Sequence, residues 1–174
     1  MILIALGSNL STGVWKSPVD ICLAALDRLE VVGVRICALS RFYETAPVPV
    51  SDQPWFVNAV ASVDCDLPAE ALLALLHQVE AEFGRVRRAV NEARLLDLDL
   101  IDHNGMINEI GPVLPHPRLS GRAFVLYPLH DVAPDWRHPV DGRSVADLIA
   151  MLPSDQAIRP MVPQPTRHGG AALP

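Results

Sequence analysis

The hydrophobic positions of the chain fall into short runs that predict β-strands. Residues 2–6 (ILIAL) are apolar without alternation, as in a buried strand, and the turn sequence Gly7-Ser8-Asn9 ends this run. Residues 34–43 alternate and contain β-branched side chains, which predicts a second strand. Two further strands are predicted at 55–63 and 95–101. Between the second and third strands, residues 45–54 contain three prolines and are predicted to form a loop.

Apolar side chains recur at helical spacing in two longer stretches. In the first, Ser17 is the predicted N-cap, Pro18 takes the first helical position and Gly33 ends the helix. Its apolar positions are Val19, Leu23, Leu26 and Leu29. The second helix runs from residue 67 to Gly84, with a stripe of Leu72, Leu75, Leu76, Val79 and Phe83. Shorter helices are predicted at 123–132 and, after a Ser144 cap, up to residue 151.

The order of these elements is β-α-β-β-α-β followed by helices. This order predicts an α+β fold with a ferredoxin-like βαββαβ core, in which two helices cover one face of the sheet. The C-terminal helical extension would cover the other face, giving three αβα layers. Residues 1–152 are predicted to form one domain. Residues 153–174 are rich in proline, glycine and arginine without an apolar period, which predicts a flexible tail.

Composition narrows the class of protein. The chain has 174 residues, of which 50% are hydrophobic and 20% charged, as in an ordinary globular domain. No apolar run approaches the roughly 20 residues of a membrane span, and the apolar start has no basic flank, so neither a membrane anchor nor a signal peptide is expected. The net charge of −6 argues against a nucleic-acid partner. Three widely spaced cysteines fit neither a disulfide framework nor a zinc site, which favours a cytoplasmic protein.

Two aspartates on the fourth predicted strand are the strongest chemical signal. Asp97 and Asp99 are two positions apart, so both project from one face while Leu96, Leu98 and Leu100 enter the core. Neighbouring carboxylates repel each other unless a cation lies between them, and Mg²⁺ prefers one or two carboxylates together with substrate phosphates. Alternatively, both acids face solvent or pair with nearby arginines.

Arginines next to this acid pair favour a polyphosphate substrate. Arg85, Arg87 and Arg88 precede the strand, and Arg94 lies at its start. Guanidinium groups and a metal ion together neutralise a phosphoryl group in transfer. A P-loop is excluded because the only lysine, Lys16, follows a tryptophan instead of a glycine.

Two other segments contain candidate binding residues. His116 and Arg122 flank a turn that leads into a predicted helix N-terminus, a location that favours anions. Phe56 and Asn58 share one face of the third strand, and an aromatic ring beside an amide suits a flat heteroaromatic ligand. Each of these residues could also be ordinary turn or core structure.

Taken together, the motifs resemble the hydroxymethyldihydropterin pyrophosphokinase family. The similar segments occur in family order at residues 7–10, 43–47, 52–59, 80–87, 94–100, 115–118 and 122–129. The Arg-x-x-Asp-x-Asp element followed by Pro-His-Pro-Arg is the most specific of them. The resemblance implies an enzyme that transfers pyrophosphate from ATP to 6-hydroxymethyl-7,8-dihydropterin in folate biosynthesis, with AMP as the second product. It also implies a monomer that acts on these two small molecules, with no nucleic-acid or membrane partner.

The resemblance assigns roles to individual residues. Asp97 and Asp99 match the ligands of two Mg²⁺ ions, and the residues that match catalytic positions are Arg85, Arg94, Asp97, Asp99 and Arg122. The residues that match the ATP site are His77, Glu80, Arg87, Leu100 and His116. The residues that match the pterin pocket are Thr45, Ala46, Val48, Phe56, Asn58 and Phe124, with the pterin ring between the two phenylalanines.

Two positions depart from the family pattern. The family commonly has tyrosine in place of Phe56, and it often has Trp-Gly-Pro or Trp-Gly-Ala before the arginine that corresponds to Arg94. This chain has Asn91-Glu92-Ala93 there, so the tryptophan that would cover the site is missing.

Two rival functions are compatible with part of this residue pattern. A metal-dependent phosphodiesterase or nuclease also uses paired aspartates, but the acidic balance of the chain argues against it. A catalytically silent pterin- or nucleotide-binding module is the other alternative, and the intact acid and arginine set argues against that one.

Overall fold

The computed structural model describes residues 1–47, 52–84 and 95–164. Its elements are β1 (Ile2–Ser8), α1 (Pro18–Val31), β2 (Arg35–Leu39), β3 (Tyr43–Thr45), β4 (Phe56–Asp64), α2 (Ala69–Glu82), β5 (Asp97–His103), the 3-10 turn η1 (Leu119–Gly121), α3 (Ala123–Val132), α4 (Val145–Ala150) and β6 (Ile158–Pro160). The predicted α+β class is confirmed. Among the described residues, no helix has the length and apolar character needed to cross a membrane.

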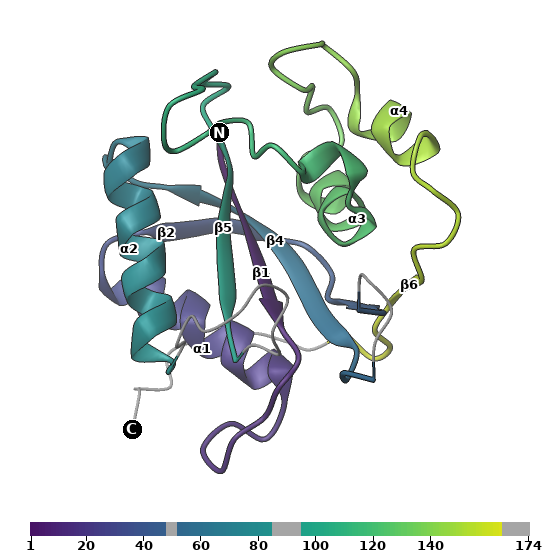
Figure 1. Cartoon of the computed structure of the whole chain (residues 1–174). Helices are drawn as coiled ribbons and strands as arrows, with labels where there is room; N and C mark the ends of the chain where they lie inside the picture. The colour runs from purple at the N-terminus through teal and green to yellow at the C-terminus, as the bar shows by residue number, and fades with distance from the viewer. Residues whose placement is uncertain (48–51, 85–94, 165–174) are drawn as a thin grey trace.

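The strands form one antiparallel sheet in the order β5-β1-β4-β3-β6. The long strand β4 pairs with β1 along one edge, and along the other it pairs with β2 and then with β3. Figure 1 shows α1 and α2 on one side of this sheet and α3 and α4 on the other. The sheet is therefore the middle layer of the molecule.

Alternation along β1 explains the two layers of core. Ile2, Ile4 and Leu6 pack with α1 and α2, while Leu3 and Ala5 pack with α3 and α4. A strand buried on both faces has no polar positions to alternate with, which is why residues 2–6 form a continuous apolar run. The predicted first helix is also confirmed, because Ser17 and Asp20 form a reciprocal capping box at its start.

The prediction of one continuous strand at residues 34–43 is wrong. The segment is divided into β2 and β3 at Ser40. The Ser40 amide donates to the Val60 carbonyl oxygen at 2.9 Å, and the Ser40 hydroxyl accepts from the Val60 amide at 3.0 Å. The hydroxyl thereby replaces a backbone acceptor of the ladder, and the chain turns before pairing resumes at Tyr43.

The tail prediction is also corrected for the residues that follow α4. Strand β6 pairs with β3, and Met161 donates its amide to the Phe42 carbonyl oxygen. These contacts are backbone hydrogen bonds at a sheet edge, so they require no apolar period and leave no pattern in the sequence. Residues 165–174 lie outside the described part of the chain.

Candidate active site

The two aspartates lie at the beginning of β5 on one face of the sheet. Leu98 and Leu100 are buried against the layer of α1 and α2, while Asp97 and Asp99 are half-buried on the α3 side. The geometric prediction for the acid pair is confirmed. The same alternation places the Leu100 side chain away from the carboxylates, so its predicted contribution to an ATP site is limited to its backbone.

Gly7 on β1 lies between the acid pair on β5 and the side chains of β4. It lies opposite Asp97 on β5 and opposite Asn58 on β4. A Cβ atom at Gly7 would lie 3.0 Å from Asn58 Oδ1 and 3.9 Å from the Asp97 Cβ. Glycine is therefore required for the close approach of these two side chains, on either side of β1.

The residues predicted to bind the pterin meet at the other side of Gly7. Thr45 and Asn58 are buried, and Asn58 Nδ2 donates a 2.7 Å hydrogen bond to Thr45 Oγ1. This bond fixes the amide with its Oδ1 toward Gly7. Phe56 pairs with Thr45 in the sheet register and is half-buried. Ala46 follows, and its amide donates to the Ala157 carbonyl oxygen at 3.1 Å.

Arg122 and Phe124 reach the same region from the start of α3. The Arg122 guanidinium lies 5.2 Å from the centre of the Phe124 ring, and its Nη1 is 3.7 Å from Asp99 Oδ2. A cation over an aromatic face is attracted by the ring quadrupole. The α3 N-terminus therefore brings one cation to the acid pair, and the Phe124 ring lies beside that cation.

His116 approaches Asp99 from the segment after β5. Its amide donates to the Ile101 carbonyl oxygen at 2.9 Å, and its Nδ1 accepts from the Arg118 amide at 3.2 Å. Burial lowers the pKa of His116, and the charges of Arg122 and Arg118 lower it further against the opposing effect of Asp99. The imidazole is therefore neutral at pH 7, and with Nδ1 as acceptor its Nε2–H is a donor.

Glu80 on α2 forms a hydrogen bond with the backbone of β5 between the two aspartates. It is buried, and its Oε1 accepts a 2.7 Å hydrogen bond from the Leu98 amide, between the two aspartates in sequence. His77 lies one turn earlier on α2 and is half-buried. The observed contact of Glu80 positions β5, and the ATP contacts expected of both residues stay predictions.

Several predicted site residues lie outside the described part of the chain. They are Val48, Arg85, Arg87, Arg94 and the segment Asn91-Glu92-Ala93, which differs from the family pattern. The structure brings together Asp97, Asp99, His116 and Arg122 at one side of Gly7, and Thr45, Phe56 and Asn58 at the other. Phe124 lies beside the Arg122 guanidinium at the start of α3.

The sequence pattern predicted Gly7 as part of a turn, whereas it lies within β1, and it predicted no role for Gln156. A glycine at the end of a strand is the available signal for the first. Gln156 hydrogen-bonds to the backbone around Arg122, and nothing in the composition of the tail indicates this contact.

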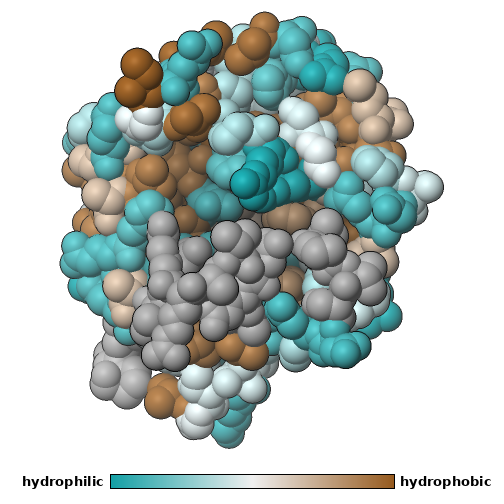
Figure 2. Space-filling view, in the orientation of Figure 1, coloured by the Kyte–Doolittle hydropathy of each residue, from teal (hydrophilic) through white to brown (hydrophobic). Residues whose placement is uncertain are grey.

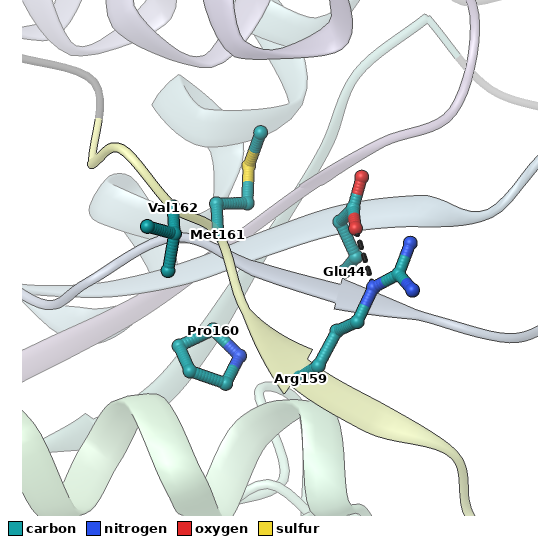
Figure 3. A pocket seen from close by; sticks show the side chains of 5 residues that line it. All are labelled: Glu44, Arg159, Pro160, Met161 and Val162. Atoms are coloured by element: carbon teal, nitrogen blue, oxygen red, sulfur yellow. Dashed lines mark hydrogen bonds and ion pairs between the residues drawn. The ribbon is translucent and has the colours of Figure 1, made fainter.

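Other surface features lie apart from this constellation. A hollow of about 340 Å³ is lined by Glu44, Arg159, Pro160, Met161 and Val162. Figure 3 shows Glu44 and Arg159 pointing toward each other across it, joined at 2.7 Å. Glu44 and Thr45 are consecutive on β3 and project from opposite faces, so this hollow opens on the face away from Asn58.

An apolar patch lies on the segment between β5 and η1. Its exposed side chains are Met106, Ile107, Ile110 and Val113. Figure 2 shows brown atoms at the upper edge of the molecule, where Figure 1 draws this segment. The patch follows the end of β5, whereas Asp97 and Asp99 lie at its beginning, so it does not contribute to the acid site.

The family pattern and two related proteins that match this chain all name the same kind of enzyme. The sequence pattern of the 7,8-dihydro-6-hydroxymethylpterin-pyrophosphokinase (HPPK) family matches residues 3–134. A 2-amino-4-hydroxy-6-hydroxymethyldihydropteridine pyrophosphokinase of Pseudomonas aeruginosa is 41% identical over 154 residues, covering 87% of this chain and 91% of that protein. The protein of the same name from Haemophilus influenzae is 35% identical over 167 residues, covering 95% and 92%.

The similarity also extends to a longer protein. The Folic acid synthesis protein fol1 of Pneumocystis carinii is 36% identical over 163 residues, which are 93% of this chain. This chain spans only 21% of that protein.

Proposed function

Because this chain belongs to the 7,8-dihydro-6-hydroxymethylpterin-pyrophosphokinase family, we propose that the two groups of residues around Gly7 are the two substrate sites of one transfer reaction. The chain is an ATP-dependent pyrophosphokinase of folate synthesis. The observation that supports the site assignment is the register of β1, in which Gly7 lies between Asp97 and Asn58. Two ligands bound on either side of this glycine would be adjacent.

The acid side of Gly7 suits Mg-ATP. Two half-buried carboxylates on one face supply hard oxygen ligands, and Mg²⁺ completes its coordination with water and phosphate oxygens. Among the described residues, no group of three or more His, Cys, Asp or Glu side chains is arranged to hold a metal ion. A metal bound by the two aspartates alone would complete its coordination with substrate and water oxygens. We infer that Asp97 and Asp99 hold two Mg²⁺ ions, which would neutralise phosphate charge when bound.

Arg122 and His116 fit the phosphate groups of the same ligand. Arg122 presents a guanidinium beside Asp99, which suits the charge that develops on transferring phosphate oxygens. The neutral His116 can donate from Nε2 to a phosphate or ribose oxygen without adding charge. The predicted partners Arg85, Arg87 and Arg94 would complete this set.

The amide side of Gly7 suits the pterin. Asn58 and Thr45 form a buried polar pair whose remaining groups can bond the edge of a flat heterocycle. Phe56 and Phe124 supply aromatic faces, and rings of this kind stack with a pterin ring. The hydrophobic walls would exclude water from the hydroxymethyl group.

The reaction that follows is a displacement at the β-phosphorus of ATP. The hydroxymethyl oxygen of the pterin forms a bond to this phosphorus, the bond to the oxygen bridging to the α-phosphorus breaks, and AMP leaves while the alcohol proton is released. The protein residues contribute by holding the two substrates in line and by stabilising phosphate charge. No observation favours the nuclease or the silent binding module considered from the sequence.

Three further proposals accompany this function. The strand order, with β5 beside β1, β1 beside β4 and the β2–β3 strand on the far side of β4, supports a ferredoxin-like core. Three free cysteines support a reducing, cytoplasmic location. We also propose that the protein acts as a monomer.

Product analysis tests the proposed function. The purified chain is incubated with ATP, Mg²⁺ and 6-hydroxymethyl-7,8-dihydropterin, and the nucleotides are separated by chromatography. We expect one AMP for each pterin consumed, and no AMP when the pterin or Mg²⁺ is omitted. Formation of ADP in place of AMP, or AMP formation without pterin, would contradict the proposal.

A further inference from the structure

The side chain of Gln156 holds the backbone on both sides of Arg122. Its Oε1 accepts a 2.9 Å hydrogen bond from the Ala123 amide, and its Nε2 donates a 2.9 Å hydrogen bond to the Gly121 carbonyl oxygen. Gly121 and Ala123 are the two sequence neighbours of Arg122. One amide group therefore fixes the peptide units that determine where the Arg122 side chain begins.

The start of α3 needs such a partner. Arg122 is the N-cap residue, and its own side chain makes no capping hydrogen bond. The first amides of a helix have no acceptor within the helix. Gln156 supplies the acceptor for Ala123 from a residue 33 positions later in the chain. It thus does from a distance what a Ser, Thr, Asp or Asn cap does locally.

The same segment is attached to the predicted pterin site. The Ala157 carbonyl oxygen accepts from the Ala46 amide at 3.1 Å, and Ile158 pairs with Thr45 at the beginning of β6. Residues 156–158 therefore join the α3 start, which carries Arg122 and Phe124, to the end of β3. The proposed function places Arg122 beside the phosphates of ATP, and both Phe124 and Thr45 beside the pterin.

We propose that Gln156 is a positioning residue of the transfer reaction, which sets Arg122 and Phe124 relative to Asp99 and the Thr45–Asn58 pair. The inference rests on the proposed function of Arg122. Gln156 acts through the backbone and is not assigned any contact with substrate. Its loss should reduce stabilisation of the transition state because Arg122 would sample several positions.

The chain offers a matched control in Gln164. The Gln164 side chain makes the same kind of contact with the backbone. Its Oε1 accepts from the Phe42 amide at 2.8 Å, and its Nε2 donates to the Met161 carbonyl oxygen and lies 3.5 Å from the Phe42 carbonyl oxygen. It belongs to the same C-terminal segment, but Phe42 is a core residue away from Arg122. A purely structural role would make the two glutamines equivalent.

The experiment compares Gln156→Met with Gln164→Met, which keep side-chain volume and remove the hydrogen bonds of the side-chain amide. We expect Gln156→Met to lower kcat about tenfold, with the KM for ATP changed less than about twofold, because the lost interaction matters in the transition state. Gln164→Met should keep kcat within about twofold. Both variants should lower the melting temperature by similar amounts. A second variant, Gln156→Glu, keeps the acceptor for Ala123 and should have an intermediate kcat.

A double-mutant cycle with Arg122→Ala shows whether Gln156 acts through Arg122. In the Arg122→Ala background, Gln156→Met should cause no further loss of kcat, since coupled residues are not additive. Additive losses, or equal kcat for the two glutamine variants, would overturn the positioning role. If the wild-type chain forms no AMP, the proposed function itself fails. If the wild type forms AMP but Arg122→Ala keeps full kcat, the proposed role of Arg122 fails, and the positioning role of Gln156 fails with it. An active enzyme that depends on Arg122 and not on Gln156 contradicts this inference alone.

Discussion

Arg122 Nη1 lies 3.7 Å from Asp99 Oδ2, which is beyond hydrogen-bonding distance and within the range of a loose ion pair. Both side chains are partly exposed, so their attraction is weak. A polyphosphate can therefore compete with Asp99 for Arg122, while a divalent cation competes with Arg122 for Asp99. Arg122 is thus in position to bind the phosphates of Mg-ATP, and Asp99 is in position to bind its metal ion.

Substitution of Arg122 tests this relationship. Arg122→Ala should reduce kcat about a hundredfold, because one cation aimed at the transferring phosphate is lost. Arg122→Lys should retain part of the activity, since it keeps the charge but not the planar, bidentate geometry of arginine. Steady-state AMP formation gives both values. A lysine variant slower than the alanine variant would show that charge at this position does not assist transfer.

Gly7→Ala tests the close approach between the two halves of the site. The added Cβ would lie 3.0 Å from Asn58 Oδ1, so the Asn58 amide must shift by a few tenths of an ångström, which disturbs its bond to Thr45. We expect the KM for the pterin to rise severalfold, up to about tenfold, because one oriented hydrogen bond is weakened. Gly13→Ala is the control, since a Cβ there meets nothing within 4 Å. Equal pterin KM values for both variants would contradict the assignment of Asn58.

The attachment of α3 to the sheet should depend on pH. Asp131 on α3 accepts hydrogen bonds from Arg41 Nη2 at 2.7 Å and from the Tyr43 hydroxyl at 2.9 Å. Burial raises the pKa of Asp131, but these hydrogen bonds and the charge of Arg41 outweigh burial and leave the pKa below its ordinary value of 3.8. Because the folded pKa is depressed, the stabilisation is complete above about pH 4 and is lost as pH falls through the folded pKa.

Asp131→Asn should therefore lower the free energy of unfolding by about 1 kcal/mol at pH 7, and by less at pH 3. Urea denaturation at the two pH values measures the difference. The control is Asp64→Asn, which removes an ion pair with Arg35 whose side chains are both more than half exposed and should change stability little. The same loss for Asp131→Asn at both pH values would contradict the pKa argument.

The acid pair and the helices were predictable because their signals are local. Asp97 and Asp99 alternate with leucines in the printed sequence, and the Ser17 cap lies beside the helix it begins. The roles of Gly7 and Gln156 were not predictable in this way. Gly7 matters because of Asn58 and Asp97 on two other strands, and Gln156 because of a helix start 33 residues earlier. Such contacts depend on the pairing of strands and on the path of the tail, which no local pattern specifies.

The division at Ser40 has a similar origin. The alternation of residues 34–43 favours a strand throughout, and the interruption arises because a serine hydroxyl competes for the Val60 amide. Serine is common within strands and at their ends, so the residue type alone does not distinguish the two cases. The pairing with β4 determines whether the strand is interrupted at Ser40.

Three aspartates on β5 allow the most direct test of the acid site. Asp97 and Asp99 are half-buried on the proposed metal face, whereas Asp102 is buried and accepts hydrogen bonds from Trp136 Nε1 at 2.7 Å and from the Gly105 amide at 2.9 Å. Asp102 thus has a structural role on the same strand. Removing one of two repelling acids should not destabilise the metal-free protein, whereas removing the charge of the buried Asp102 weakens its two hydrogen bonds.

The deciding measurement is AMP formation by Asp97→Asn, Asp99→Asn and Asp102→Asn at saturating Mg²⁺, ATP and pterin, with the melting temperature of each metal-free variant determined in parallel. We predict that Asp97→Asn and Asp99→Asn lose at least about a hundredfold in kcat while their melting temperatures stay level or rise. Asp102→Asn should melt earlier and keep a kcat near that of the wild type. Retained activity in both Asp97→Asn and Asp99→Asn would contradict a pyrophosphoryl-transfer site at the beginning of β5.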